Sequence, residues 1–169
     1  MVSLPGSLKL AGRHVLTSWP SEVSVAPECV SKFNELKLKK ELKYIIYKLS
    51  DDYKEIVVEE TSTDPDWETF QQKLMNAKSS HRGKEGAGPR YAVYDFQYEK
   101  EGGEGTRNKI VFIAWSPDEG TLIFPRMTYA SSKESLKLAL TGVANEVQAN
   151  REDEIEYETI LKDITKGTR

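Results

Sequence analysis

The segment RNKIVFIAWSP, residues 107–117, constrains the fold more than any other part of this chain. Its apolar run is nearly unbroken, and such a run is typical of a strand that is covered on both faces. A strand of this kind needs neighbouring strands and a layer of helices on each side of the sheet. The segment therefore predicts the central strand of a sheet.

The rest of the chain supplies those neighbours in a definite order. Strand patterns occupy residues 41–50, 53–62 and 90–99, with a short one at 146–150. Helical spacing occupies 27–38, 64–75, 125–140 and 152–164, and Asp64 and Pro65 suit the cap and first position of the second helix. This order predicts an α/β sandwich, with a central mixed β-sheet flanked by helices on both faces. Residues 77–89 contain no large apolar side chain, so we expect a mobile loop there.

Length and composition indicate one globular domain. The chain has 169 residues, of which 38% are apolar and 30% charged, and we place the domain at 21–169, after a flexible extension at 1–20. A net charge of −3 argues against a nucleic-acid binder, and no apolar run approaches the roughly 18 residues of a membrane span. The single cysteine, Cys29, excludes an intramolecular disulfide and fits a reducing, intracellular compartment. Nothing predicts oligomerisation, so we expect a monomer.

The sequence shows little catalytic machinery. The glycines of GGEGTRN lack the third glycine and the following helix of a dinucleotide fingerprint. His14 and His81 have no neighbouring Cys or His at metal-ligand spacing. Cys29 lies in the first turn of a predicted helix, where a thiolate can be favoured, but no second active-site residue accompanies it. We expect an inert thiol, no enzyme activity, no cofactor and no metal, and an enzyme acting through Cys29 is the least favoured alternative.

The helix predicted at 125–140 carries more than the one apolar stripe that a fold requires. At about 100° per residue, three groups of side chains share its surface. These are a core stripe (Tyr129, Leu136, Leu140, Val143), a basic stripe (Arg126, Lys133 and Lys137, with Ala130 between them) and, roughly opposite the core stripe, an apolar edge (Met127, Leu138). An apolar edge beside three cations indicates a docking surface for an acidic partner. The alternative is that this edge packs against another element of the same domain.

Several segments match a known family in that family's own order. They are VSVAPECVSKFNELKLKKELKYIIYKLSDDYKEIVVEE, STDPDWETF, RYAVYDFQYE, KIVFIAWSPD and, above all, MTYASSKESLKLALTGV. Together they run from about residue 21 to residue 166. On these segments the chain resembles the ADF/cofilin family, whose domain is the actin-depolymerising factor homology domain, and it is most similar to fungal cofilins.

The resemblance implies the family's fold, a mixed central sheet between helices, and a non-enzymatic actin-binding protein. Such a protein prefers ADP-actin, binds monomers and filament sides, and severs or depolymerises filaments. The family's monomer- and filament-binding surface corresponds here to Ser21, Arg126, Met127, Lys133, Lys137 and Leu138. Its filament-specific site corresponds to Arg107, Lys109, Lys162 and Lys166. The implied location is the cytoplasmic actin cytoskeleton, with the nucleus left open.

The chain departs from the family pattern at several positions. Ser21 matches the regulatory serine, whose phosphorylation would add about −1.5 to −2 charges beside an acidic partner, but an extension precedes it and Glu22 replaces a glycine. Phe124 and Leu138 stand at basic positions of the family. The pair Lys162-Asp163 reverses an acidic–basic order, and the loop at 77–89 is longer than the family norm. We infer that monomer binding is retained and leave weakened severing open.

A second function remains as an alternative. In it the domain is a phosphoinositide-binding module with weak or lost filament severing, and its basic clusters mainly meet anionic lipid. Attraction to lipid depends on the number of cations and on salt, whereas actin docking also needs the apolar side chain of Met127. The substitution Met127→Ala therefore separates the two functions.

Overall fold

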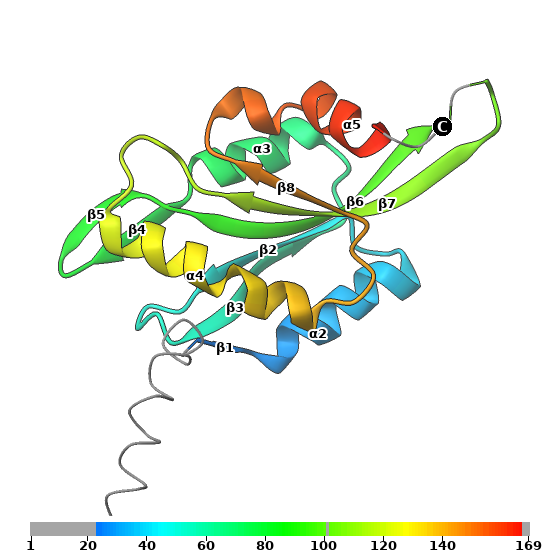
Figure 1. Ribbon diagram of the computed structural model, residues 1–169. Coiled ribbons are helices and arrows are strands. Elements are labelled where there is room, and N and C mark those ends of the chain that lie inside the picture. The colour runs from blue at the N-terminus through cyan, green and yellow to red at the C-terminus, as the bar shows by residue number, and fades with distance from the viewer. Residues whose placement is uncertain (1–22, 101, 167–169) are drawn as a thin grey trace, which may run out of the picture.

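The computed structural model describes residues 23–100 and 102–166, and these residues form one six-stranded mixed sheet with helices on both faces (Figure 1). The strand order is β1-β3-β2-β6-β7-β8. The strands are β1 (Ser24–Val25), β2 (Tyr44–Leu49), β3 (Glu55–Ser62), β6 (Arg90–Glu99), β7 (Thr106–Trp115) and β8 (Asn145–Ala149). Pairings at the two edges, β1 with β3 and β7 with β8, are parallel, and the others are antiparallel. The predicted α/β sandwich is confirmed.

Two helices cover each face of this sheet. Helix α2 (Pro27–Asn34), which continues into the π-helical turn η2 (Glu35–Lys39), lies with α4 (Ile123–Ala139) on one face (Figure 1). Helices α3 (Trp67–Met75) and α5 (Tyr157–Thr165) lie on the other, with the short 3₁₀ helix η3 (Glu152–Ile155) between β8 and α5. The single helix predicted at 152–164 is therefore two helices, η3 and α5, separated at Glu156.

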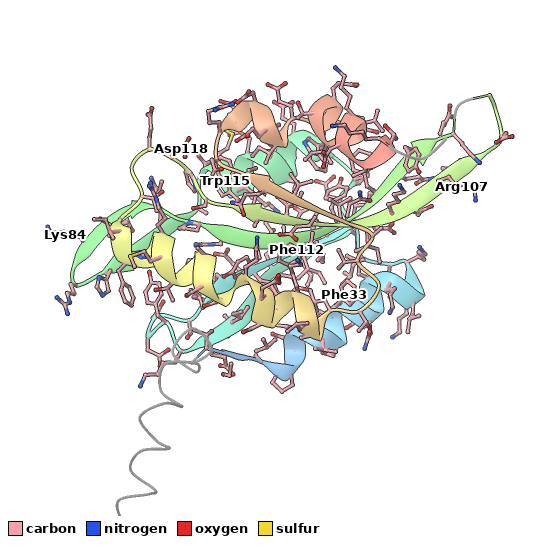
Figure 2. All side chains as sticks on the ribbon, in the orientation of Figure 1. Phe33, Lys84, Arg107, Phe112, Trp115 and Asp118 are labelled. Atoms are coloured by element: carbon pink, nitrogen blue, oxygen red, sulfur yellow. The ribbon has the colours of Figure 1, made fainter. Side chains whose placement is uncertain are left out.

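The side chains of each strand alternate between two separate cores. Ile45, Val93 and Phe112 belong to the core beneath α2 and α4, where Phe33 of α2 also lies (Figure 2). Their immediate neighbours Tyr44, Tyr94 and Val111 belong to the core beneath α3 and α5. This period of two is the geometry of a pleated strand. It explains why the sequence of β7 is apolar without interruption.

The position of β7 in the sheet differs from the prediction. All six residues from Ile110 to Trp115 are buried, as the apolar run requires. Yet β7 lies next to the edge strand β8, and the middle of the sheet is formed by β2 and β6. Burial of both faces depends on the helices above and below a strand, and these extend as far as β7. The apolar run therefore correctly predicted that both faces of β7 are buried. The prediction that β7 is the central strand was wrong.

Residues 77–89 are not a loop. They contain a two-stranded hairpin, β4 (Lys78–His81) and β5 (Lys84–Ala87), beside the start of α4 (Figure 1). The two turn residues, Arg82 at φ 53° and Gly83 at φ 79°, both have positive φ, as in the type I′ turn that matches the twist of paired strands. The prediction was wrong because this ribbon is held by backbone and aromatic contacts and needs no large apolar residue of its own.

Two helix starts also differ from the sequence predictions. Asp66, and not Asp64, caps α3, because its carboxylate accepts from the backbone N–H of Thr69 at 3.1 Å. Asp64 supports that cap by accepting from the backbone N–H of Asp66 at 3.0 Å. Helix α4 begins at Ile123, two residues before the predicted start at Pro125. A proline is tolerated in the first turn because the N–H that it lacks has no partner there.

Candidate functional site

Helix α4 presents the apolar edge to solvent. Tyr129, Leu136 and Leu140 are buried against the sheet, so the core stripe lies where the helical wheel placed it. Met127 is 62% exposed and Leu138 is 81% exposed, and neither packs into a core of the described residues. The alternative in which this edge contacts another element of the same domain is therefore excluded for the part of the chain that the structure describes.

Two apolar side chains that the sequence analysis missed extend this edge. Ile123 is 76% exposed, and Phe124 is also exposed, both in the first turn of α4. Their signal in the sequence is the run TLIFP at residues 121–125, which lies before the predicted helix start at Pro125. With Met127 they form a contiguous set on the first two turns, and we call Ile123, Phe124 and Met127 the N-terminal apolar patch.

The lysines of the basic stripe are held by a carboxylate of the neighbouring strand. Glu146 on β8 accepts from Lys133 at 2.8 Å and from Lys137 at 2.5 Å. These hydrogen bonds lower the pKa of Glu146 below its ordinary value and raise the pKa of Lys137 above its ordinary value. Sequence reasoning did not find Glu146, because its contact depends on β8 pairing beside α4. The stripe is therefore pre-oriented, and an acidic partner has to compete with Glu146 for both ammonium groups.

Arg126, the third member of the basic stripe, points to the turn before its own helix. Its guanidinium donates to the carbonyl oxygens of Asp118 at 2.9 Å and Pro117 at 3.3 Å. It also lines, with Tyr129 and Lys133, a hollow of about 400 Å³ between α4 and the ends of β7 and β8. Arg126 therefore fixes the approach of the chain to α4 while keeping an exposed charge at its surface.

The four residues predicted for filament binding lie on the projecting part of β7 and on the end of α5, and Lys162 and Lys166 line a hollow together with Glu146 of β8. Arg107 is exposed on the part of β7 that projects beyond the helices (Figure 2). Lys109 donates to the carbonyl oxygen of Ile164 at 2.8 Å and lies over the ring of Tyr98, 5.9 Å from its centroid. This bond ties β7 to the end of α5, where Lys162 and Lys166 are exposed. The structure therefore places these four cations on adjoining elements.

Some sequence predictions fall outside the described residues, or outside any site. Ser21, His14 and the extension at 1–20 belong to the part of the chain that the structure does not describe. Cys29 is buried, its thiol donates to the carbonyl oxygen of Ile56 at 3.3 Å, and burial raises its pKa to about 11. Such a thiol is protonated at neutral pH and is a poor nucleophile.

Neither a metal cluster nor a membrane span is present in the residues that the structure describes. Over 23–100 and 102–166, no three His, Cys, Asp or Glu side chains lie together as ligands. Within the same ranges no helix has the length and apolarity needed to cross a bilayer. The features that remain are two surfaces, one on α4 and one at the projecting end of β7 with α5.

Comparison with known proteins gives a consistent result. Residues 22–165 match the family model described as cofilin/tropomyosin-type actin-binding protein. The chain is 57% identical over 148 residues to the cofilin of Gibberella zeae, covering 87% of this chain and 96% of that protein. It is 44% identical to the cofilin of Schizosaccharomyces pombe, covering 86% and 97%. A crystal structure of Streptomyces griseoflavus cofilin superposes with a TM-score of 0.74 at 37% identity, covering 86% of this chain and 98% of that one.

Proposed function

This chain belongs to the ADF/cofilin family of actin-binding proteins, and we propose that it binds actin monomers and filament sides through α4, prefers the ADP form, and severs and depolymerises filaments. The observation that carries the proposal is the exposed apolar edge, Met127 and Leu138, beside oriented lysines on one helix. A folded domain has no internal use for such an arrangement.

Both components of this surface favour a protein partner. Burying an exposed Met or Leu side chain contributes about 1.5–3 kcal/mol, so the edge supplies affinity. The cations Arg126, Lys133 and Lys137 supply orientation and a faster encounter with an acidic surface. The resulting interface is a helix seated in a groove of its partner, where apolar anchors lie at helical spacing.

The second surface accounts for filament binding and severing. We assign Arg107, Lys109, Lys162 and Lys166 to a contact with a neighbouring actin subunit. If the two surfaces fit adjacent subunits best at a twist that the bare filament disfavours, binding shifts the filament toward that twist. Strain is then concentrated where decorated and bare segments meet, and rupture occurs there.

Several finer properties belong to the same proposal. Phosphorylation of Ser21 would place about −1.5 to −2 charges beside the actin contact and oppose binding. The domain acts as a monomer, on the actin cytoskeleton of the cytoplasm, without catalytic activity of its own. Nuclear location is left open, because the sequence offers only the short basic run KLKK at residues 37–40.

Co-sedimentation with ADP-actin filaments tests the proposed function. The full chain, a chain that starts at Ser21, and the variants Met127→Ala and Leu38→Ala are compared for pelleted protein and released actin monomer. Leu38 is the matched control, since it is 72% exposed on η2 and lies outside both surfaces. We expect binding and monomer release by the wild type and by Leu38→Ala, and clear weakening by Met127→Ala. Failure of both wild-type chains to bind would contradict the proposal.

Phosphoinositide binding is the second candidate function. The exposed cations Arg107, Lys162 and Lys166 favour it, because they stand on two adjoining elements, β7 and the end of α5, away from the apolar edge of α4. Sedimentation with vesicles that contain phosphatidylinositol bisphosphate separates the candidates. If lipid is the main partner, Met127→Ala leaves vesicle binding unchanged and added salt abolishes it.

A further inference from the structure

The hairpin β4–β5 is attached to the body of the domain at its base. The guanidinium of Arg90 donates to the carbonyl oxygen of Lys78 at 2.7 Å and to the hydroxyl of Ser79 at 3.2 Å. Arg90 is itself buried and bonded to Glu59 at 2.7 Å. In addition, the N–H of Gly88 donates to the carbonyl oxygen of Ala77 at 2.8 Å. The base of the hairpin therefore cannot swing independently of the sheet.

A second attachment joins the hairpin to the turn before α4. The N–H of Ala87 donates to the carbonyl oxygen of Gly120 at 2.9 Å. The backbones approach so closely here that a Cβ on Gly86 would overlap that same carbonyl oxygen. Only glycine permits this approach, because any other residue forces the strand away from the turn.

A third attachment is aromatic and involves the N-terminal apolar patch itself. The ring of His81 stacks on Phe124, with centroids 4.0 Å apart and planes 12° apart. The rings of Tyr53 and Phe124 pack edge to face, with centroids 5.1 Å apart. The hydroxyl of Tyr53 donates to the carbonyl oxygen of Ser80 at 2.9 Å. Such ring pairs contribute beyond their buried area. The hairpin and the first turn of α4 therefore form one continuous, fixed surface.

The charge of the hairpin tip is unpaired, unlike that of α4. Arg82 and Lys84 are exposed, and neither makes an ion pair or side-chain hydrogen bond among the described residues. In contrast, Lys133 and Lys137 are both bound to Glu146. Lys84 marks the far end of the hairpin, beyond the start of α4 (Figure 2). The tip of the hairpin therefore offers two cations that no carboxylate of the described residues neutralises.

We propose that the hairpin β4–β5 is a fixed basic arm that extends the actin-contacting surface of α4, with Arg82 and Lys84 pairing with acidic side chains of the same actin subunit. This inference rests on the proposed function. Its partner follows from continuity, because the arm joins an exposed apolar patch that has to be covered by protein to gain from burial. An anionic membrane is the less suitable partner. The tip carries two cations beside Glu85, fewer than the four to eight that typify lipid-binding clusters.

Affinity for labelled ADP-actin monomers, measured at low and at physiological salt, tests the arm. The full chain is compared with Arg82→Ser/Lys84→Ser, with Glu85→Gln, and with Lys32→Ser/Lys39→Ser as a control of equal charge change on α2 and η2. We expect the hairpin double variant to bind about threefold to tenfold more weakly, with a reduced salt dependence. Glu85→Gln should bind about twofold more tightly, and the control should match the wild type. All substituted side chains are on the surface, so equal thermal unfolding verifies that folding is intact.

Three outcomes would contradict the proposed role of the hairpin in actin binding. If the hairpin double variant binds actin like the wild type while Met127→Ala weakens binding, the arm is wrong and the proposed function stands. If the wild type itself does not bind actin, both fall together. If the hairpin double variant keeps its affinity for actin but loses binding to vesicles that contain phosphatidylinositol bisphosphate, the arm is a lipid contact.

Discussion

At the scale of single residues, Glu146 controls the charge that α4 offers to a partner. Its carboxylate lies between Lys133 and Lys137, and its pKa is lowered by both. Because the folded-state pKa lies below the unfolded value, this group stabilises the fold above its ordinary pKa. That stabilisation is lost as the pH falls through the folded-state value.

Glu146→Gln is expected to cost less than about 1 kcal/mol of unfolding free energy at neutral pH, because the pair is partly exposed to solvent. The cost should vanish only in acid below the lowered folded-state pKa of Glu146, where the carboxylate of the wild type is protonated as well. Urea unfolding of wild type and variant at both pH values measures it. A difference that persists in acid would mean that Glu146 contributes through packing and not through its charge.

The same substitution has an opposite expected effect on binding. With Glu146 neutral, Lys133 loses its carboxylate partner and Lys137 keeps only Glu134 at 3.3 Å, so both pair more readily with an acidic partner and actin affinity should rise about twofold to threefold. Monomer binding measured by fluorescence checks this result. A fall in affinity would show instead that Glu146 orients the two lysines for their partner.

Cys29 is expected to resist alkylation in the folded protein. Its thiol is buried and its pKa is raised to about 11, so almost no thiolate exists near pH 8. Iodoacetamide should label the unfolded chain at once and the folded chain only at the rate of unfolding, as mass spectrometry can follow. Rapid labelling of the folded chain with loss of actin binding would instead support a functional role for Cys29.

At the scale of elements, Gly86→Ala tests how the hairpin is held. The added methyl group has to displace the carbonyl of Gly120, so β5 should separate from the turn before α4. We expect faster amide hydrogen exchange at Ala87 and across β4–β5, with the exchange of β6 and β7 unchanged. Gly83→Ala is the control, since nothing surrounds that position and only its φ of 79° is strained. Equal exchange in both variants would mean that turn strain, and not the contact with Gly120, governs the hairpin.

The elements that the sequence predicted well are those whose signal is local. Runs of β-forming residues and local alternation placed β2, β3 and β6, and the helical wheel correctly separated Tyr129 and Leu136 from Met127 and Leu138. The hairpin at 78–87 was not predicted, because its contacts with Gly120 and Phe124 come from a distant segment. Glu146 escaped for the same reason. The site was thus predictable where one helix decides it, and not where strand order brings separate elements together.

At the scale of the whole molecule, the two cores share the strands between them and should unfold together. Phe33→Ala in one core and Phe70→Ala in the other should each cost about 3–5 kcal/mol. Two of the three tryptophans, Trp67 and Trp115, lie in the core of Phe70, so in a Trp19→Phe background tryptophan fluorescence reports on that side. We expect Phe33→Ala to lower the fluorescence midpoint and the circular-dichroism midpoint equally. Two separate transitions would mean that each face of the sheet is stable alone.

The register of β6 and β7 has a consequence for how the molecule can change. The two strands pair without interruption from Arg90 opposite Trp115 to Glu99 opposite Thr106, about 30 Å at 3.3 Å per residue. One end lies beneath α4, where Arg90 meets Tyr129, and the other carries Arg107. The separation along these strands between the two proposed actin contacts is therefore a whole number of residue pairs. A single inserted residue would turn the side chains beyond it to the wrong face, so the reach of the molecule can be lengthened only in matched steps of two residues on both strands.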